Sequence, residues 1–411
     1  MLARFLLGLG TAALALAALD SSYMMPVDDD AIRYTKGPID DAVSRLQRRI
    51  DSGEVHLRYE DRFGYLRSVL KELNAPPSSQ VLVFSKTSFQ APKISPRTPR
   101  ALYFNDNVVV GFVRTGDVLE FAALDPRQGV MFYTLDQEPS TRPRFARRDV
   151  CLQCHQSPAT LGIPGLMVRS VMPDWNGMPS GSFGGFITDH RSALKERWGG
   201  WYVTGNTGDQ EHMGNAVLQH AGDEELPVSD ETRNVTDLSR LIETNEYLKP
   251  SSDVVALMTL EHETQMTNLM TRVGWEARLA PGNDAGINSG VEELLDYMLF
   301  SGETKFKAPV KGNSGFTEDF EKRGPRDAKG RSLHDFDLTT RMFRYPCSFL
   351  IYSEAWDGMP AVVKDRVYRR LWEVLSGKDQ SAQFAHLTTL DRRAITEILL
   401  ATKKGLPGYW R

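Results

Sequence analysis

Cysteine is scarce in this chain, which has three among 411 residues. Three are too few for a scaffold built on disulfides, so their positions matter more than their number. The sequence also lacks an excess of charge of one sign, because 49 Lys and Arg against 53 Asp and Glu give a formal net charge of −4. That balance excludes the basic footprint of a nucleic-acid-binding protein. No internal apolar run reaches the roughly 18 residues of a spanning helix, so we expect no multi-span membrane insertion.

The N-terminus differs from the rest of the chain. It carries one charge, Arg4, followed by an apolar run from Phe5 to Leu19 that is rich in alanine. A basic start, a short apolar core and small residues predict a secretory signal peptide over residues 1–18, with cleavage near Ala17 or Ala18. We therefore expect a periplasmic or otherwise exported protein, with an uncleaved N-terminal anchor as the alternative.

Hydropathy patterning predicts an α+β fold in three regions. Residues 20–140 contain two segments of helical period, 38–50 and 63–73, and then a β-meander. The meander is indicated by five short β-branched and aromatic runs, separated by turn residues, at 81–84, 101–104, 108–113, 119–124 and 130–135.

The remaining two regions differ in glycine content and period. Residues 141–250 are glycine-rich and predict long loops packed around a group other than protein, with short strands at 166–171 and 201–204. Residues 251–411 return to the helical period and include a charged, glycine-rich stretch, 302–332, that predicts a flexible insert. The helices expected there are 253–273, 290–300, 361–375 and 389–402.

One motif carries chemistry. Residues 151–155 read Cys-Leu-Gln-Cys-His, which is the C-x-x-C-H attachment pattern of haem c. Two thiols three positions apart on one helical turn can form thioethers with the two vinyl groups of one haem, and the next residue then offers an imidazole to the iron. The motif predicts one covalent haem c held by Cys151 and Cys154, with His155 as the proximal iron ligand.

Through Cys151, Cys154 and His155 the sequence resembles c-type cytochromes. Its length and surroundings also resemble large bacterial proteins that contain a cytochrome c domain. The resemblance covers five residues and the predicted signal, and it does not extend to a fold. It implies haem c and export, because bacteria complete haem c attachment outside the inner membrane, and it implies no particular reaction.

Two other readings of the motif stay open. A structural zinc site would need four ligands, and the only further cysteine is the isolated Cys347, which we expect to be a buried free thiol. A thiol–disulfide exchange motif would use a thiol of lowered pKa, usually where a long helix begins after a first strand. The glycine-rich surroundings of Cys151 do not match that context.

The sixth iron ligand has two leading candidates. His212 lies in a glycine-rich loop, 205–215, whose backbone can approach a flat ligand closely. His262 lies in a predicted helix with methionines at a spacing of four, although such a stripe is more often core. The helical methionines are Met258, Met266 and Met270, and further candidates are Met167, Met172, Met178 and Met213.

These observations support three functions. A six-coordinate haem would transfer single electrons to a redox partner protein of unknown identity. An open haem would make a peroxidase-like enzyme, with Glu261, His262 or Glu263 as acid or base. A haem-based sensor or binding protein is the third.

Four arginines precede the motif: Arg142, Arg144, Arg147 and Arg148. They could bind haem propionates, form a docking patch for an acidic partner, or belong to a solvated connector.

Overall fold

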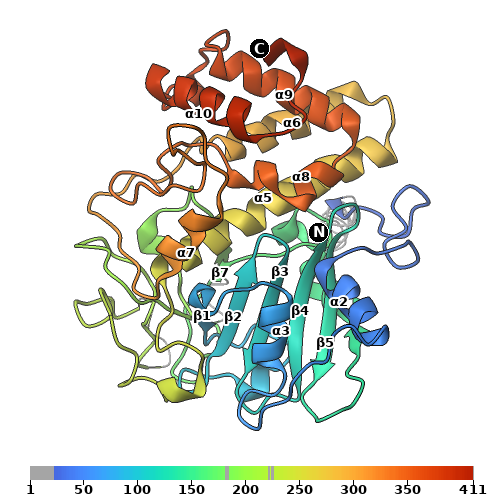
Figure 1. Ribbon diagram of the computed structural model, residues 1–411. Coiled ribbons are helices and arrows are strands. Elements are labelled where there is room, and N and C mark those ends of the chain that lie inside the picture. Colours follow the sequence, from blue (N-terminus) through green and yellow to red (C-terminus); the bar gives the residue numbers. More distant parts are fainter. Residues whose placement is uncertain (1–22, 181–184, 221–222, 224–225, 411) are drawn as a thin grey trace, which may run out of the picture.

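Figure 1 shows the computed structural model of the chain, in which residues 23–180, 185–220, 223 and 226–410 are described. Helices and an antiparallel sheet make an α+β fold, which confirms the predicted class. The predicted signal peptide, residues 1–18, lies outside the described residues. Among the helices that are described, none combines the length and apolar character needed to cross a membrane.

The centre of the fold is a meander extended at both edges. Within the described residues the sheet has seven strands in the order β6-β5-β4-β3-β2-β1-β9, and every neighbouring pair is antiparallel. The strands are β1 (Val81–Val83), β2 (Arg100–Asn105), β3 (Val108–Val113), β4 (Val118–Asp125), β5 (Gly129–Asp136), β6 (Phe145–Arg147) and β9 (Trp201–Tyr202). Two more, β7 (Arg169–Ser170) and β8 (Phe186–Ile187), form a separate pair. The first five strands coincide closely with the five runs expected from sequence.

Both faces of the sheet are covered. Tyr103, Phe121 and Tyr133 belong to the core shared with α2 (Ala42–Asp51) and α3 (Leu66–Glu72). Phe104 and Phe132 belong to the core on the other face, shared with the C-terminal helices. Successive side chains of a strand point to opposite faces, so a sheet covered twice has strands that are apolar at nearly every position.

Helix α5 (Val254–Leu279) joins the sheet to the helical region (Figure 1). It is buried on most sides, which explains why its sequence shows no sharp polar face. The carboxylate of Asp253 caps its N-terminus by accepting from the backbone N–H groups of Val255 and Ala256. The other helices after β6 are α4 (Leu152–His155), α6 (Asp284–Met298), α7 (Phe316–Arg323), α8 (Glu354–Gly358), α9 (Ala361–Leu375) and α10 (Thr389–Thr402).

The segment expected as a flexible insert, 302–332, is packed instead. It contains α7, whose Phe316 and Phe320 are each 1% exposed and belong to the main core. The backbone N–H groups of Asn313 and Ser314 also donate to the carboxylate of Asp253. The charged residues and glycines of this segment belong to its outer surface. Phe316 and Phe320, one helical turn apart, pack into the core and hold the segment against the protein.

Candidate functional site

The C-x-x-C-H motif lies directly after the last strand of the meander. A 3-10 turn, Asp149–Cys151, continues into α4, so the motif occupies one compact helical stretch, as the spacing predicts. The N–H of Arg148 donates to the carbonyl of Phe132 over 2.8 Å, which holds the start of the motif beside β5. Cys151 is partly buried and Cys154 is exposed, and both thiols are free.

The imidazole of His155 is held in one orientation. Its Nδ1 lies 2.9 Å from the carbonyl oxygen of Gly165, and because a carbonyl only accepts, Nδ1 carries the hydrogen. Nε2 therefore presents a lone pair, and it has no hydrogen-bond partner among the described residues. The ring packs against Phe132 with centroids 4.8 Å apart, and burial lowers the pKa of His155. A histidine that ligates a metal characteristically donates its other ring N–H to such an oxygen.

The surroundings of the motif suit a large apolar group. Five hydrophobic residues of this region pack on the main core while keeping part of their surface open: Val109, Ala122, Leu152, Leu161 and Leu166. Ala122 is directly opposite Phe132 in the β4–β5 register, and the ring of Phe132 packs against His155. The five partly open residues therefore form an apolar floor that continues from the Phe132 ring. The residues present thus fit a haem bound through Cys151, Cys154 and His155.

The acceptor of His155 is itself anchored. The amide of Asn268 on α5 accepts from the N–H of Leu166 over 3.2 Å and donates to its carbonyl over 2.7 Å. A Cβ added at Gly165 would lie 2.3 Å from the side-chain oxygen of Asn268, so this close approach requires glycine.

The other readings of the motif find little support. Within the described residues, no group of three or more His, Cys, Asp or Glu side chains is placed to hold a metal ion such as zinc. Burial raises the pKa of the Cys151 thiol, whereas a thiol used for disulfide exchange has a lowered pKa. Cys347 is buried and free, as expected.

His212 has a local explanation that needs no iron. It is 2% exposed, and its Nδ1 accepts from the backbone N–H of Gly214 over 3.1 Å. In the neutral ring the hydrogen then lies on Nε2, which leaves no lone pair for a metal. Trp198 packs on the ring at 5.3 Å, and burial, with the charge of Arg233, lowers the pKa of His212 to about 4. This arrangement favours a structural role.

His262 is also fully engaged. Its Nε2 lies 2.8 Å from the hydroxyl of Ser348, and its Nδ1 lies 3.0 Å from Nδ1 of His190. The ring is completely buried and stacks on Tyr297 and Phe300, and burial lowers its pKa to about 3. Ligation of iron would break one of its hydrogen bonds, so the structure favours the alternative in which a neighbour satisfies this histidine. The sixth ligand stays a prediction.

The two glutamates that flank His262 differ sharply. Glu261 forms a buried ion pair with Arg197, with Nη1 and Oε2 3.2 Å apart, and it also accepts from the hydroxyl of Thr188. Glu263 is 5% exposed and has no hydrogen-bond partner among the described residues for its buried Oε1. Burial raises the pKa of Glu263 well above its ordinary value, and the nearby charge of Asp106 adds to this.

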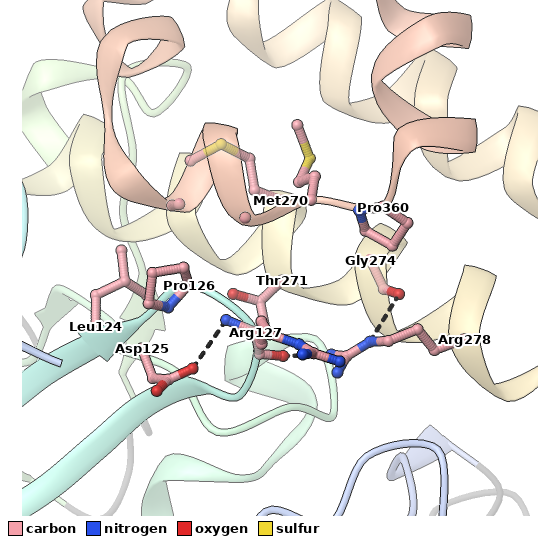
Figure 2. A pocket seen from close by; sticks show the side chains of 12 residues that line it. Leu124, Asp125, Pro126, Arg127, Met270, Thr271, Gly274, Arg278 and Pro360 are labelled. Atoms are coloured by element: carbon pink, nitrogen blue, oxygen red, sulfur yellow. Dashed lines mark hydrogen bonds between the residues drawn. The ribbon is translucent and has the colours of Figure 1, made fainter. Parts of the chain in front are cut away.

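A cavity of about 280 Å³ contains none of the predicted site residues (Figure 2). It lies between the β4–β5 turn, α5 and the segment before α9, and its lining mixes apolar residues with Asp125, Thr271 and two arginines, Arg127 and Arg278. Arg278 donates to the carbonyls of Gly274 and Arg127 in the last turn of α5, where a helix favours a cation. Burial and the charge of Arg127 lower the pKa of Arg278 to about 10. Its position at the helix end explains Arg278 without a ligand.

The four arginines before the motif separate into two kinds. Arg147 donates to the carbonyl of Tyr34 and pairs with Asp149, and Arg148 donates to the hydroxyl of Thr134. The exposed guanidinium groups of Arg142 and Arg144 have no partner in the described part of the chain. The second pair is therefore the one available for an anionic group.

Comparisons of the chain with protein-family models, curated proteins and solved structures found no match.

Three features of the site were not predicted from the sequence: the Gly165 acceptor, the Asn268 anchor, and the isolation of Glu263 beside Asp106. None of them follows from spacing along the chain, although Glu263 was named there as one of three candidate acids.

Proposed function

We propose that this protein is an exported cytochrome that binds one haem c and transfers single electrons to a redox partner protein. The observation that carries the proposal is the orientation of His155, whose Nδ1 faces the Gly165 carbonyl and leaves the Nε2 lone pair free. The same helical turn offers two free thiols, Cys151 and Cys154. Those three groups are the complete attachment set of a haem c.

In this function the chain supplies attachment, orientation and exclusion of water. Cys151 and Cys154 would hold the macrocycle and His155 would ligate its iron, while the bound haem supplies a metal that alternates between ferric and ferrous states. The hydrogen bond to Gly165 fixes the ring plane of His155 and increases its basicity. The apolar floor formed by Val109 and Ala122 would keep water from one side of the group.

Electron transfer is preferred over a peroxidase-like reaction because most of the acid–base groups named for that reaction are occupied. Glu261 is paired with Arg197, and both ring nitrogens of His262 are hydrogen-bonded. A general acid or base must reach a substrate proton, and neither group is free to do so.

The test is to produce the chain in a bacterial host that has a haem c maturation system and to record spectra. We expect a pyridine haemochrome of the c type and a low-spin ferric spectrum that does not respond to peroxide. Cys151→Ser and Cys154→Ser should each lose one thioether and shift the haemochrome band, whereas the control Cys347→Ala, a buried thiol outside the motif, should not. A wild-type protein without haem would refute the cofactor, and a high-spin spectrum that changes with peroxide would favour the enzyme.

A further inference from the structure

One face of the central sheet is partly open close to the motif. All residues of β3 and β4 are buried except Val109, Glu120 and Ala122. Glu120 and Ala122 are two apart on one strand, and Val109 is directly opposite Ala122, so the three side chains share a face. Val109 and Ala122 belong to the apolar floor described above, and Glu120 extends the same surface to a charged group.

The charged group is an ion pair between Arg100, the first residue of β2, and Glu120. Nη1 of Arg100 lies 2.8 Å from Oε2 of Glu120, and the two side chains are 19% and 17% exposed. Glu120 also accepts from the hydroxyl of Ser88 over 3.0 Å and from the side-chain amide of Gln90 over 3.1 Å. Three donors thus hold the carboxylate, and the carboxylate holds the guanidinium.

Most of the hydrogen-bonding capacity of Arg100 is unused. A guanidinium has five N–H donors in a rigid fork, and among the described residues Arg100 donates only through Nη1, to Glu120. Its Nε is buried and has no partner there. A buried donor without a partner is costly, and a guanidinium binds a carboxylate best through two parallel bonds. Arg100 is therefore oriented to bind a second carboxylate.

The ion pair lies beside the start of the motif. Glu120 is directly opposite Thr134 of β5, so their side chains are neighbours on one face of the sheet. The hydroxyl of Thr134 accepts from Nε of Arg148 over 2.8 Å. The carbonyl of Arg148 in turn accepts from the N–H of Cys151 over 3.1 Å. A continuous series of contacts therefore joins Glu120 to the first cysteine of the motif.

The electrostatics of the motif agree with this position. Burial is the main cause of the raised pKa of Cys151, and the negative charge of Glu120 raises it further. Burial is likewise the main cause of the lowered pKa of His155, and the positive charge of Arg100 lowers it further. Such effects weaken with distance, so both members of the ion pair lie close to the residues that would hold the haem.

We propose that Arg100, oriented by Glu120, binds a propionate of the haem. This inference rests on the proposed function, because it requires a haem attached at Cys151 and Cys154. A haem has an apolar ring and two carboxylates on one edge, and the surface beside the motif has the same two parts. The apolar floor would contact the ring, and the free donors of Arg100 would pair with one carboxylate in the bidentate manner that suits a guanidinium.

The arginines that precede the motif are less suited to this role. The guanidinium groups of Arg142 and Arg144 have no partner among the described residues, but both residues are exposed to solvent. An ion pair in water contributes little, whereas a partly buried one is screened less. Arg100 is already held by a fixed carboxylate, so less side-chain entropy is lost when it binds a second one.

The test uses the full-length protein matured in the haem c-competent host, with and without ¹³C in the propionate carboxyls of its haem. The difference between the two infrared spectra isolates the propionate bands. Arg100→Gln should shift one of these bands, because it removes the charge and the fork, and Arg100→Lys, which keeps the charge, should shift it less. The matched control Arg144→Gln removes an exposed arginine and should leave the bands in place.

The proposal is overturned if the propionate bands of Arg100→Gln match those of wild type, or if Arg144→Gln shifts them as far. Should Arg100→Gln fail to fold, the same criterion applies to Arg100→Lys. Wild-type protein without haem would refute the proposed function and this inference together, whereas attached haem with unshifted bands would refute this inference alone.

Discussion

Asn268 gives the sharpest test of how the His155 site is held. Its side chain makes two hydrogen bonds to the backbone of Leu166, the residue that follows the acceptor of His155. Asn268→Ala removes both partners at once. Each buried backbone group left unsatisfied costs about 1–3 kcal/mol, and because Leu166 is only partly buried we expect a total near the lower end, about 2–3 kcal/mol.

Equilibrium urea unfolding and calorimetry measure this loss. For 411 residues the unfolding entropy makes 1 kcal/mol worth roughly 1 °C, so the Tm should fall by about 3 °C. The control is Gln265→Ala on the same helix, where no side-chain hydrogen bond exists among the described residues and the change should stay within about 0.5 kcal/mol. An Asn268→Ala protein as stable as the control would refute the view that α5 anchors the loop behind His155.

Other predictions concern the buried groups. Glu261→Gln should destabilise the protein by about 3–5 kcal/mol in urea unfolding, because it leaves the Arg197 charge buried and unpaired; a change below about 1 kcal/mol would contradict this. Phe320→Ala should cost about 3–5 kcal/mol if α7 is part of the core, whereas a flexible insert would lose almost nothing. Burial, aided by the charges of two arginines, lowers the pKa of His334 to about 3. The neutral imidazole therefore stabilises the folded state fully above about pH 6.5, and this stabilisation is lost by about 1.4 kcal/mol per pH unit as the pH falls toward 3. His334→Phe should therefore gain on wild type as the pH falls from 6.5 to 4, and parallel stability curves would contradict the assignment.

Local signals in the sequence predicted much of the framework. The five runs of the meander became β1 to β5, and the helices expected at 361–375 and 389–402 are present with those bounds. Pro360 precedes the first of these and Ser376 with Gly377 follows it, so the chain marks both ends. The C-x-x-C-H spacing likewise predicted that the two cysteines and the histidine share one turn.

Features that depend on distant contacts were not predictable. Leu166 and Asn268 are 102 residues apart, and no periodicity connects them. Helix α7 is short and charged, so its two buried phenylalanines could be recognised only once the core was known. That Oε1 of Glu263 has no hydrogen-bond partner within the described part of the chain is a property of packing, since its neighbours Glu261 and His262 in the same helix are both bonded.

The central claim is that Cys151 and Cys154 hold a haem whose iron binds His155. Intact-protein mass spectrometry of the chain from a haem c-competent host, after denaturation and treatment with iodoacetamide, tests it directly. The account predicts the mass of one haem added to the polypeptide, with Cys347 as the one thiol left to alkylate. A haem-free polypeptide in which all three cysteines are alkylated would contradict it.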